Sequence, residues 1–360
     1  MASDRVKKKP LRVALIASER TVCEYSMFLE RFLVGLADES VPVALVCPPG
    51  CRLDAVFTGT AEVIRHPVFD LPFMGRLNLR LLVERLGKFN PTVLHCLCEK
   101  QALLTAQLAR RLDLPYVLTV NSLQKRRPFL PVASSHCRRV IVPAKSIADN
   151  LAGLYPRLAD LIQQINIGTF VAEVGGCFSG ASAVATMVVA HPLDKADALE
   201  NLFGVARHLL IDGYEFMMVV VGGGRADRQL WKLLAALGLL PVVTLVPRLL
   251  PWRLVLASGD IFIRPRPSRI FDPLLLEAMS VGTTVAGCRG GVDDLIIENQ
   301  TAVVFDPDDE QSIMRTLKQL LDRRELACQI ARSAQDYLRQ NYTVSRMISD
   351  IFQAYREVQE

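Results

Sequence analysis

Residues 265–309 read PRPSRIFDPLLLEAMSVGTTVAGCRGGVDDLIIENQTAVVFDPDD. The pattern predicts a loop, an apolar helix over Pro273–Val281 and a short buried strand over Thr283–Ala286. Gly290–Gly291 lets the backbone approach a neighbour closely before a second short helix begins. One carboxylate, Glu277, interrupts the apolar helix. Because a carboxylate is rarely buried without a partner, Glu277 is predicted to accept hydrogen bonds from ligand hydroxyls.

The length and composition of the chain set the class of protein. The 360 residues are enough for about two domains, and a hydrophobic content of 51% is sufficient for two cores. No apolar run reaches the roughly 18 residues that a membrane-spanning helix needs, and the start MASDRVKKKP does not read as a signal peptide. Nine scattered cysteines fit a reducing compartment. We therefore expect a cytoplasmic protein.

The net charge of +5 is small for this length, but basic residues cluster at Lys7–Lys9, Lys125–Arg127 and Arg138–Arg139. Two interpretations are open. The clusters are either solvated surface or a contact with anionic lipid headgroups or a phosphorylated acceptor, which would hold the protein peripherally at the inner membrane surface. No aromatic-interleaved basic stripe occurs, so no nucleic-acid partner is expected.

Predicted strands and helices alternate along the chain, which is typical of α/β proteins with parallel sheets covered on both faces. This pattern predicts a first Rossmann-like domain over residues 1–168. A stretch rich in Gly, Ser and Ala predicts a linker over 169–184. The alternation then restarts and predicts a second Rossmann-like domain over 185–340, followed by a terminal helix over 341–360.

The segment LLLEAMSVGTTVAGCRGGVDDLI, Leu274–Ile296, resembles the nucleotide-sugar site of the GT-B glycosyltransferases, especially the retaining family four. In that family Glu, Ala-Met, Gly and Gly-Gly occur at these spacings. The resemblance implies two Rossmann-like domains that face each other across a cleft. The first would lie on the acceptor side, the second would bind the nucleotide sugar, and the terminal helix would cross back to the first. An ordinary helix and strand of another Rossmann-like domain is the alternative.

The same resemblance assigns Glu277 to the ribose hydroxyls of the nucleotide, and it places Gly290 and Gly291 beside the donor. A carboxylate that bridges two adjacent hydroxyls makes a charge-assisted contact. The alternative is a glutamate favoured by the helix dipole. If the ribose role holds, loss of Glu277 should weaken nucleotide binding with little effect on folding.

Three further loops of the second half correspond to donor-binding loops of the family. Lys195 matches the lysine that holds the diphosphate, one position early, and His191 stands where the family has arginine. Gly222 and Arg225 belong to a loop that resembles the glycine-rich loop beside the nucleotide. Arg248 follows a strand whose backbone contacts the nucleobase in the family. For Lys195 the alternative is a surface lysine at the start of a helix.

The chain departs from the family at residues near the reacting sugar. Arg269 stands eight positions before Glu277, where the family has its first glutamate, and Asp272 is the carboxylate that would serve instead. Arg269 would then neutralise the diphosphate. Asn121 follows a strand of the first half where many members have histidine. We therefore assign catalytic roles to Arg269, Asp272 and Asn121.

A metal site is weighed separately at the sequence His95-Cys-Leu-Cys98. The spacing invites a metal, but no second cluster of ligands is visible. Lining of the acceptor cleft and simple packing are the other interpretations, and packing is favoured. We expect neither a metal nor a cofactor.

The resemblance implies a metal-independent, hexosyltransferase-like enzyme of glycan biosynthesis. It would move a sugar from a nucleotide-diphosphate-sugar to a hydroxyl of a glycan or lipid-linked acceptor, with retention of configuration. The main alternative is a non-catalytic GT-B homologue that binds nucleotide or glycan or scaffolds other transferases. A sugar-nucleotide epimerase or a phosphorylase fits less well, since neither a catalytic set of carboxylates and histidines nor a pyridoxal lysine signature is found.

Overall fold

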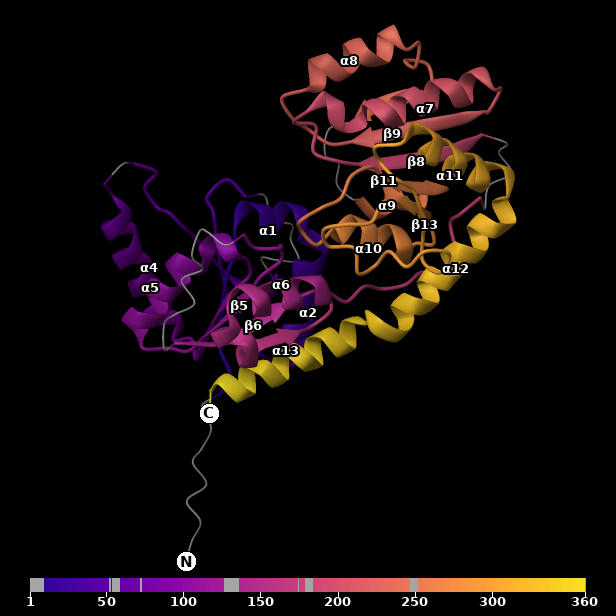
Figure 1. The fold of residues 1–360 in the computed structure, drawn as a ribbon. Helices are drawn as coiled ribbons and strands as arrows, with labels where there is room; N and C mark the ends of the chain where they lie inside the picture. The colour runs from indigo at the N-terminus through magenta and orange to yellow at the C-terminus, as the bar shows by residue number, and fades with distance from the viewer. Residues whose placement is uncertain are drawn as a thin grey trace, which may run out of the picture. The chain divides into compact units, whose positions relative to one another are not determined.

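The computed structural model describes residues 10–359 except 52, 54–58, 72, 126–135, 174, 179–183 and 247–251. The chain forms two compact units, each with its own parallel sheet and covering helices (Figure 1). One unit holds Met1–Gly168 together with Val344–Glu360, and the other holds Thr169–Thr343. No helix in the described part of the chain is long and apolar enough to cross a membrane.

The first unit contains a seven-stranded sheet in the order β3-β2-β1-β4-β5-β6-β7, with every pairing parallel. Its strands are β1 Val13–Ile16, β2 Val43–Cys47, β3 Glu62–Arg65, β4 Val93–Cys96, β5 Tyr116–Thr119, β6 Cys137–Val142 and β7 Ile162–Gln164. Its helices include α1 Glu19–Glu24, α2 Ser26–Asp38, α4 Gly75–Phe89, α5 Ala102–Leu112, α6 Lys145–Leu154 and α13 Val344–Val358. The central strands β1 and β4 are wholly buried, because helices cover both faces of the sheet.

The second unit repeats this plan with six parallel strands in the order β10-β9-β8-β11-β12-β13. Its strands are β8 Ala185–Ala190, β9 Phe216–Val221, β10 Val243–Val246, β11 Ile261–Arg264, β12 Thr284–Gly287 and β13 Val303–Val304. Its helices include α7 Glu200–Ile211, α8 Asp227–Ala236, α9 Trp252–Ala257, α10 Pro273–Ser280, α11 Glu310–Asp322 and α12 Arg324–Asn341. In both sheets the strand order is that of a Rossmann fold.

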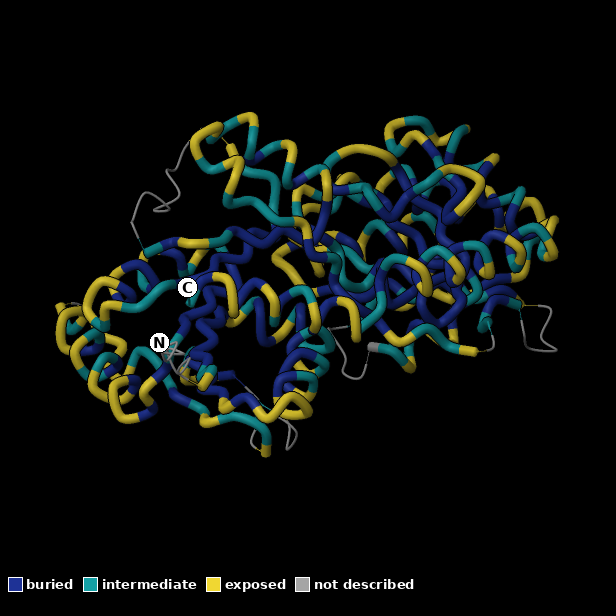
Figure 2. Tube along the Cα trace, turned by 90° about the horizontal axis from the view of Figure 1, so that it is seen from below, coloured by how far each residue is buried: buried dark blue, intermediate teal, exposed yellow. Residues whose placement is uncertain are grey.

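The two faces of the second sheet pack against different helices (Figure 1). Ile261 and Ile263 of β11 belong to a core shared with α7, α8 and α11. Since successive residues of a strand point to opposite faces, Phe262 and Arg264 point to the other face, which α9 and α10 cover. In Figure 2 the buried parts of the chain run through the interior of each unit, with exposed residues on the outer turns.

The apolar helix predicted over Pro273–Val281 is α10, which begins at Pro273 and ends one residue earlier, at Ser280. Asp272 caps its first turn and Pro273 occupies the first helical position, where a missing N–H costs nothing. After its end, Gly282 has a φ of 83°, and a Cβ there would lie 2.5 Å from the Cα of Gly175. Only glycine combines this left-handed backbone with so close a neighbour.

The predicted linker 169–184 begins inside the second unit rather than between the units. The amide of Ala172 donates to the carbonyl of Ser280 at 2.8 Å, and that of Cys177 donates to Gly282 at 3.1 Å. Thr169 also forms a bridge to Thr343. The described residues from 169 to 178 are therefore hydrogen-bonded to the ends of α10 and α12.

The last helix, α13, packs against α2, β5 and β6 of the first unit. Its Ile348 lies over Gly35 of α2, where an added Cβ would come within 2.6 Å of the isoleucine side chain. Of the basic clusters noted in the sequence, Arg139 pairs with Glu357 of this helix at 2.5 Å. The chain therefore leaves the first unit after Gly168 and returns to it at Val344.

Candidate functional site

The carboxyl ends of the second sheet provide the best place for a ligand. Strand order reverses between β8 and β11, and open parallel sheets bind ligands in the crevice beyond such a switch point. Because all six strands are parallel, the loops that follow β8, β9, β11 and β12 lie at the same edge. Those loops contain most of the donor-binding residues that the sequence predicts.

The loops after β8 and β9 pack backbone against backbone. The amide of Ala226 donates to the carbonyl of Leu193 at 2.9 Å. A Cβ added at Gly222 would lie 2.2 Å from the carbonyl oxygen of His191, and one at Gly224 would lie 2.1 Å from the backbone of Leu193. Glycine is therefore required at both positions for the two loops to pack together. The close neighbour of Gly222 is the backbone of the loop that follows β8.

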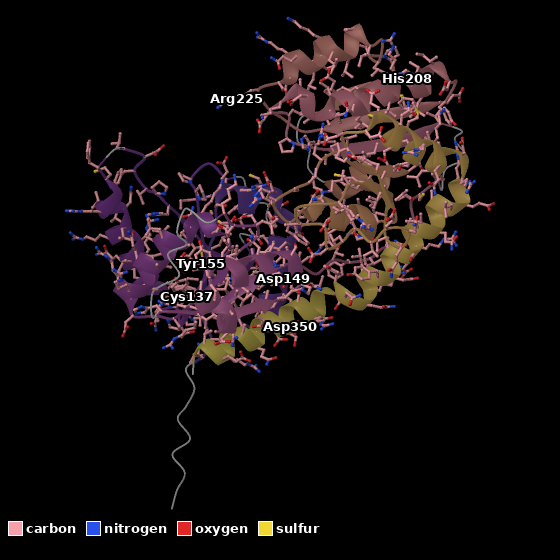
Figure 3. The ribbon with its side chains drawn as sticks, in the orientation of Figure 1. Cys137, Asp149, Tyr155, His208, Arg225 and Asp350 are labelled. Carbon is pink, nitrogen blue, oxygen red and sulfur yellow. The ribbon has the colours of Figure 1, made fainter. Side chains whose placement is uncertain are left out.

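Two cations and one imidazole lie on these paired loops. Lys195 and Arg225 are exposed, and neither has an ion pair among the described residues. Arg225 is labelled in Figure 3. Burial, followed by the nearby charge of Arg266, lowers the pKa of His191, and Asp194 opposes the shift only in part. His191 is therefore uncharged at neutral pH and can offer a ligand only a neutral N–H donor.

The glycine turn after β12 approaches the loop after β11. Gly290 and Gly291 have φ values of 103° and 74°. A Cβ at Gly291 would lie 2.0 Å from the carbonyl oxygen of Ser268, and Val292 donates its amide to that oxygen at 2.7 Å. The close approach predicted from the sequence is present, and the neighbour is Ser268.

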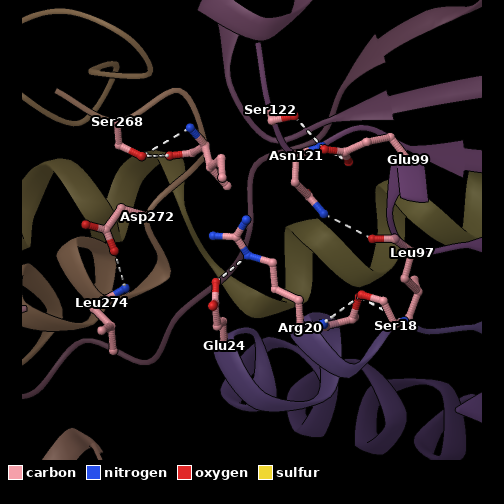
Figure 4. A network of polar contacts seen from close by, with 12 residues as sticks. Ser18, Arg20, Glu24, Leu97, Glu99, Asn121, Ser122, Ser268, Asp272 and Leu274 are labelled. Carbon is pink, nitrogen blue, oxygen red and sulfur yellow. Dashed lines mark hydrogen bonds and ion pairs between the residues drawn. The ribbon is translucent and has the colours of Figure 1, made fainter. Parts of the chain in front are cut away.

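Two residues to which we assign catalytic roles lie in and just after the loop that follows β11. Asp272 accepts hydrogen bonds from the amides of Leu274 and Leu275 at 3.0 and 3.3 Å, so it caps α10 (Figure 4). The sequence pattern predicts a catalytic role for Asp272 and not this capping of α10. Arg269 is exposed. Arg248 lies outside the described residues.

Glu277 has protein partners at both carboxylate oxygens. Its side chain is only 2% exposed. Thr169 donates to Oε1 at 3.0 Å, and Arg253 of α9 donates to Oε2 at 3.1 Å. Arg253 also donates to the carbonyl of Phe170 at 2.5 Å. Glu277 thus ties α10 to α9 and to residues 169–170. The expectation that its loss would leave folding unaffected does not agree with these contacts.

In the first unit, Asn121 joins the loops that follow β4 and β5 (Figure 4). It is 8% exposed, and its Nδ2 donates to the carbonyl of Leu97 at 3.0 Å. Ser122 donates to Glu99 at 2.5 Å in the same network. The loops lie beyond the switch point between β1 and β4, but the Asn121 side-chain amide group holds the backbone there.

His95 is a packed core residue. Its Nδ1 lies 2.5 Å from the hydroxyl of Tyr355, and its Nε2 lies 2.7 Å from that of Thr119. Complete burial lowers the pKa of His95 to about 3, so the ring is neutral. Across the described ranges, no group of three or more His, Cys, Asp or Glu side chains could hold a metal. The packing interpretation of this segment agrees with its contacts.

Arg264, the last residue of β11, is not among the site residues that the sequence predicts. It is 3% exposed, and its three guanidinium nitrogens are buried without a hydrogen-bond partner in the described part of the chain. The available signal was an arginine that continues an apolar strand directly into a candidate ligand edge. The apolar pattern predicts a strand that ends one residue earlier, at Ile263.

Two Rossmann-like units, with cations and close-packed glycine loops at the carboxyl edge of the second sheet, define the GT-B class of fold. A model described as Glycosyltransferase Family 4 matches residues 26–168, and one described as Glycosyl transferases group 1 matches residues 169–323. The chain belongs to the group 1 glycosyltransferase family.

Individual relatives agree with this assignment. The chain is 38% identical over 84 residues to the sulfoquinovosyl transferase SQD2 of Arabidopsis thaliana, which is 22% of this chain and about a sixth, 16%, of that protein. A glycosyltransferase from Rickettsia africae has a similar fold, with a TM-score of 0.79, 14% identity and coverage of 98% of this chain and 99% of that one. Anabaena HepE, solved in complex with UDP and glucose, gives a TM-score of 0.77, 14% identity and coverage of 96% and 100%.

Proposed function

We propose that the protein transfers a sugar from a nucleotide-diphosphate-sugar to a hydroxyl of a glycan or lipid-linked acceptor, with retention of configuration. The observation that carries the proposal is the pair of exposed, unpaired cations Lys195 and Arg225 on the described loops beyond the switch point of the second sheet. A leaving diphosphate needs positive charge at the place where its own charge develops. These two side chains supply it without a metal.

Uridine diphosphate is the first donor nucleotide to test, because HepE was solved with UDP. The purified protein should be screened by thermal shift against UDP-, GDP-, ADP- and CDP-linked sugars. A ligand at about 100 times its dissociation constant adds roughly 2.7 kcal/mol to stability. Release of nucleoside diphosphate from the stabilising donor then tests turnover. Stabilisation by no donor would contradict the donor site, and binding without turnover would favour the alternative below.

The non-catalytic alternative is supported by a specific observation. Asp272 caps α10 and the Asn121 side chain holds the backbone of a loop, so two of the three residues assigned to catalysis are engaged in structural contacts. Under this alternative the nucleotide would bind, but no donor would be consumed with any acceptor.

Lys195→Ala is expected to weaken binding of UDP by about 10- to 100-fold and to leave uridine binding unchanged. The lysine is proposed to meet phosphate, and a hydrogen bond to a charged group contributes about 1.5–3 kcal/mol. Isothermal titration with both ligands measures the difference. Lys232→Ala is the matched control, since Lys232 is an exposed lysine on α8 of the same unit. Equal losses for UDP and uridine would exclude a contact with the diphosphate.

A further inference from the structure

Arg264 is a buried cation, and the described residues offer it no counterion. Its Nε, Nη1 and Nη2 atoms are all shielded from solvent, and none has a hydrogen-bond partner among the described residues. Arginine stays protonated in proteins, so Arg264 keeps its positive charge although it is buried. A buried charge with neither solvent nor a partner is strongly unfavourable, so native proteins place one where it meets an opposite charge.

Three acidic groups around the same edge already have partners other than Arg264. Asp272 caps α10, Glu277 pairs with the arginine of α9, and Asp308 pairs with Arg266. The thiol of Cys288 lies close enough for its Sγ to contact the carbonyl of Arg264 at 3.6 Å. Burial nevertheless raises the pKa of Cys288 to about 11, against the opposing charge of Arg264. Cys288 is therefore a neutral thiol at neutral pH and does not balance the guanidinium.

Arg264 lies at the edge where open parallel sheets bind ligands. β11 borders the switch point, and Arg264 is its carboxyl-terminal residue. On β12 the residue in register with it is Gly287, which has no side chain, and a Cβ there would lie 3.7 Å from the Cβ of Arg264. The neighbouring strand β8 ends at Ala190, directly before the loop that carries His191 and Lys195.

We propose that Arg264 binds an oxyanion of the donor, either a phosphate oxygen or an acidic group on the transferred sugar, at the carboxyl end of β11. The planar guanidinium matches the two oxygens of a phosphate or carboxylate. His191, which carries no charge at neutral pH, leaves the β8 loop with fewer cations than a diphosphate needs, and Arg264 supplies one from the adjacent strand. This inference rests on the proposed function for the identity of the ligand, but not for the presence of an anion site.

The test compares Arg264→Met and Arg264→Lys with the wild-type protein. In anion-free buffer, Arg264→Met should melt at the same temperature as the wild type or higher, because it removes an unpaired buried charge. If the bound oxyanion is a phosphate, the affinity of Arg264→Met for inorganic pyrophosphate and for UDP should fall by about 10- to 100-fold. Arg264→Lys keeps the positive charge but not the planar guanidinium. Its affinity for these ligands should lie between those of the wild type and Arg264→Met. Arg315→Met removes an exposed arginine of α11 in the same unit and controls for net charge.

The probes separate the two sources of the oxyanion. A loss confined to UDP-glucuronate, with UDP-glucose unaffected, assigns the site to an acidic sugar. A parallel loss for pyrophosphate, UDP and both sugars assigns it to the diphosphate. Three outcomes would each overturn the proposal. Arg264→Met could bind all four probes as tightly as the wild type does, or the wild type could bind none of them. Arg264→Met could also have a lower melting temperature than the wild type in anion-free buffer.

The outcomes also separate this inference from the proposed function. Pyrophosphate binding that depends on Arg264, in a protein that binds no nucleotide, would support the anion site and remove the transferase. Tight nucleotide binding that does not change in Arg264→Met would support the proposed nucleotide site and exclude the anion site at Arg264.

Discussion

Arg253→Met is expected to lower the free energy of unfolding of the second unit by about 3 kcal/mol, which makes it more damaging than loss of the glutamate that Arg253 contacts. Arg253 is 34% exposed, so its ion pair with Glu277 is partly screened. Glu277 is 2% exposed, and the substitution removes the guanidinium that donates to its Oε2. Removing one partner of a buried ion pair is the costly outcome.

The reciprocal variant should be milder. Glu277→Met leaves Arg253 able to reach water and to keep its contact with Phe170, so the main loss is the unpaired hydroxyl of Thr169, about 1–2 kcal/mol. Urea unfolding can be followed by tryptophan fluorescence, since both tryptophans, at 231 and 252, belong to the second unit. The double variant should recover much of the loss seen in Arg253→Met. A smaller loss for Arg253→Met than for Glu277→Met would show that the pair is not the source of stability.

The first unit is expected to lose stability in mild acid because of His95. Its pKa is about 3 in the folded protein, below the value of about 6.5 for an exposed histidine. Below about pH 6.5, His95 is therefore protonated in the unfolded chain but stays neutral in the folded unit. The free energy of unfolding falls as the pH drops below that value. The slope is about 1.4 kcal/mol per pH unit, or about 3 kcal/mol between pH 6.5 and 4.5.

His95→Gln should remove this component of the acid sensitivity. The variant will be less stable at pH 7, because glutamine does not reproduce both hydrogen bonds to Tyr355 and Thr119. Its stability should then fall less steeply with pH than that of the wild type. Hydrogen exchange of peptides from β4 and α13 measures the first unit directly. His208→Gln changes an exposed histidine of α7 and serves as the control. Parallel pH profiles for wild type and His95→Gln would refute the argument.

Local patterns predicted most of the elements, and where they failed the signal was short or weak. Six apolar residues at 216–221 stand between turn residues, and this pattern predicts a strand with the bounds of β9. The apolar spacing from Tyr25 predicts a single helix, but α1 precedes it at Glu19, where Ser18 and Thr21 form a capping box. The strand β3, EVIR, is not predicted, because two adjacent apolar residues between two charged ones are not a distinctive strand pattern.

The site was less predictable, because its side chains meet partners far along the chain. Glu277 contacts Thr169, 108 positions away, and no local pattern indicates such a pair. The expected ribose acceptor is therefore also a structural anchor of its unit. Arg264 could have been noticed as a charge within an apolar run. Only the structure shows that the described chain offers its guanidinium no partner.

The return of the chain to the first unit at Val344 has a consequence for synthesis in the cell. Tyr355, which contacts His95, and Ile351 are buried in the first unit, yet they are translated only after the whole of Thr169–Thr343. At the usual pace of translation this delay is on the order of 10–30 s. The unit that begins first is thus the last to be completed, and for that interval the surface of α2, β5 and β6 that α13 covers is a nascent apolar face that chaperones must shield.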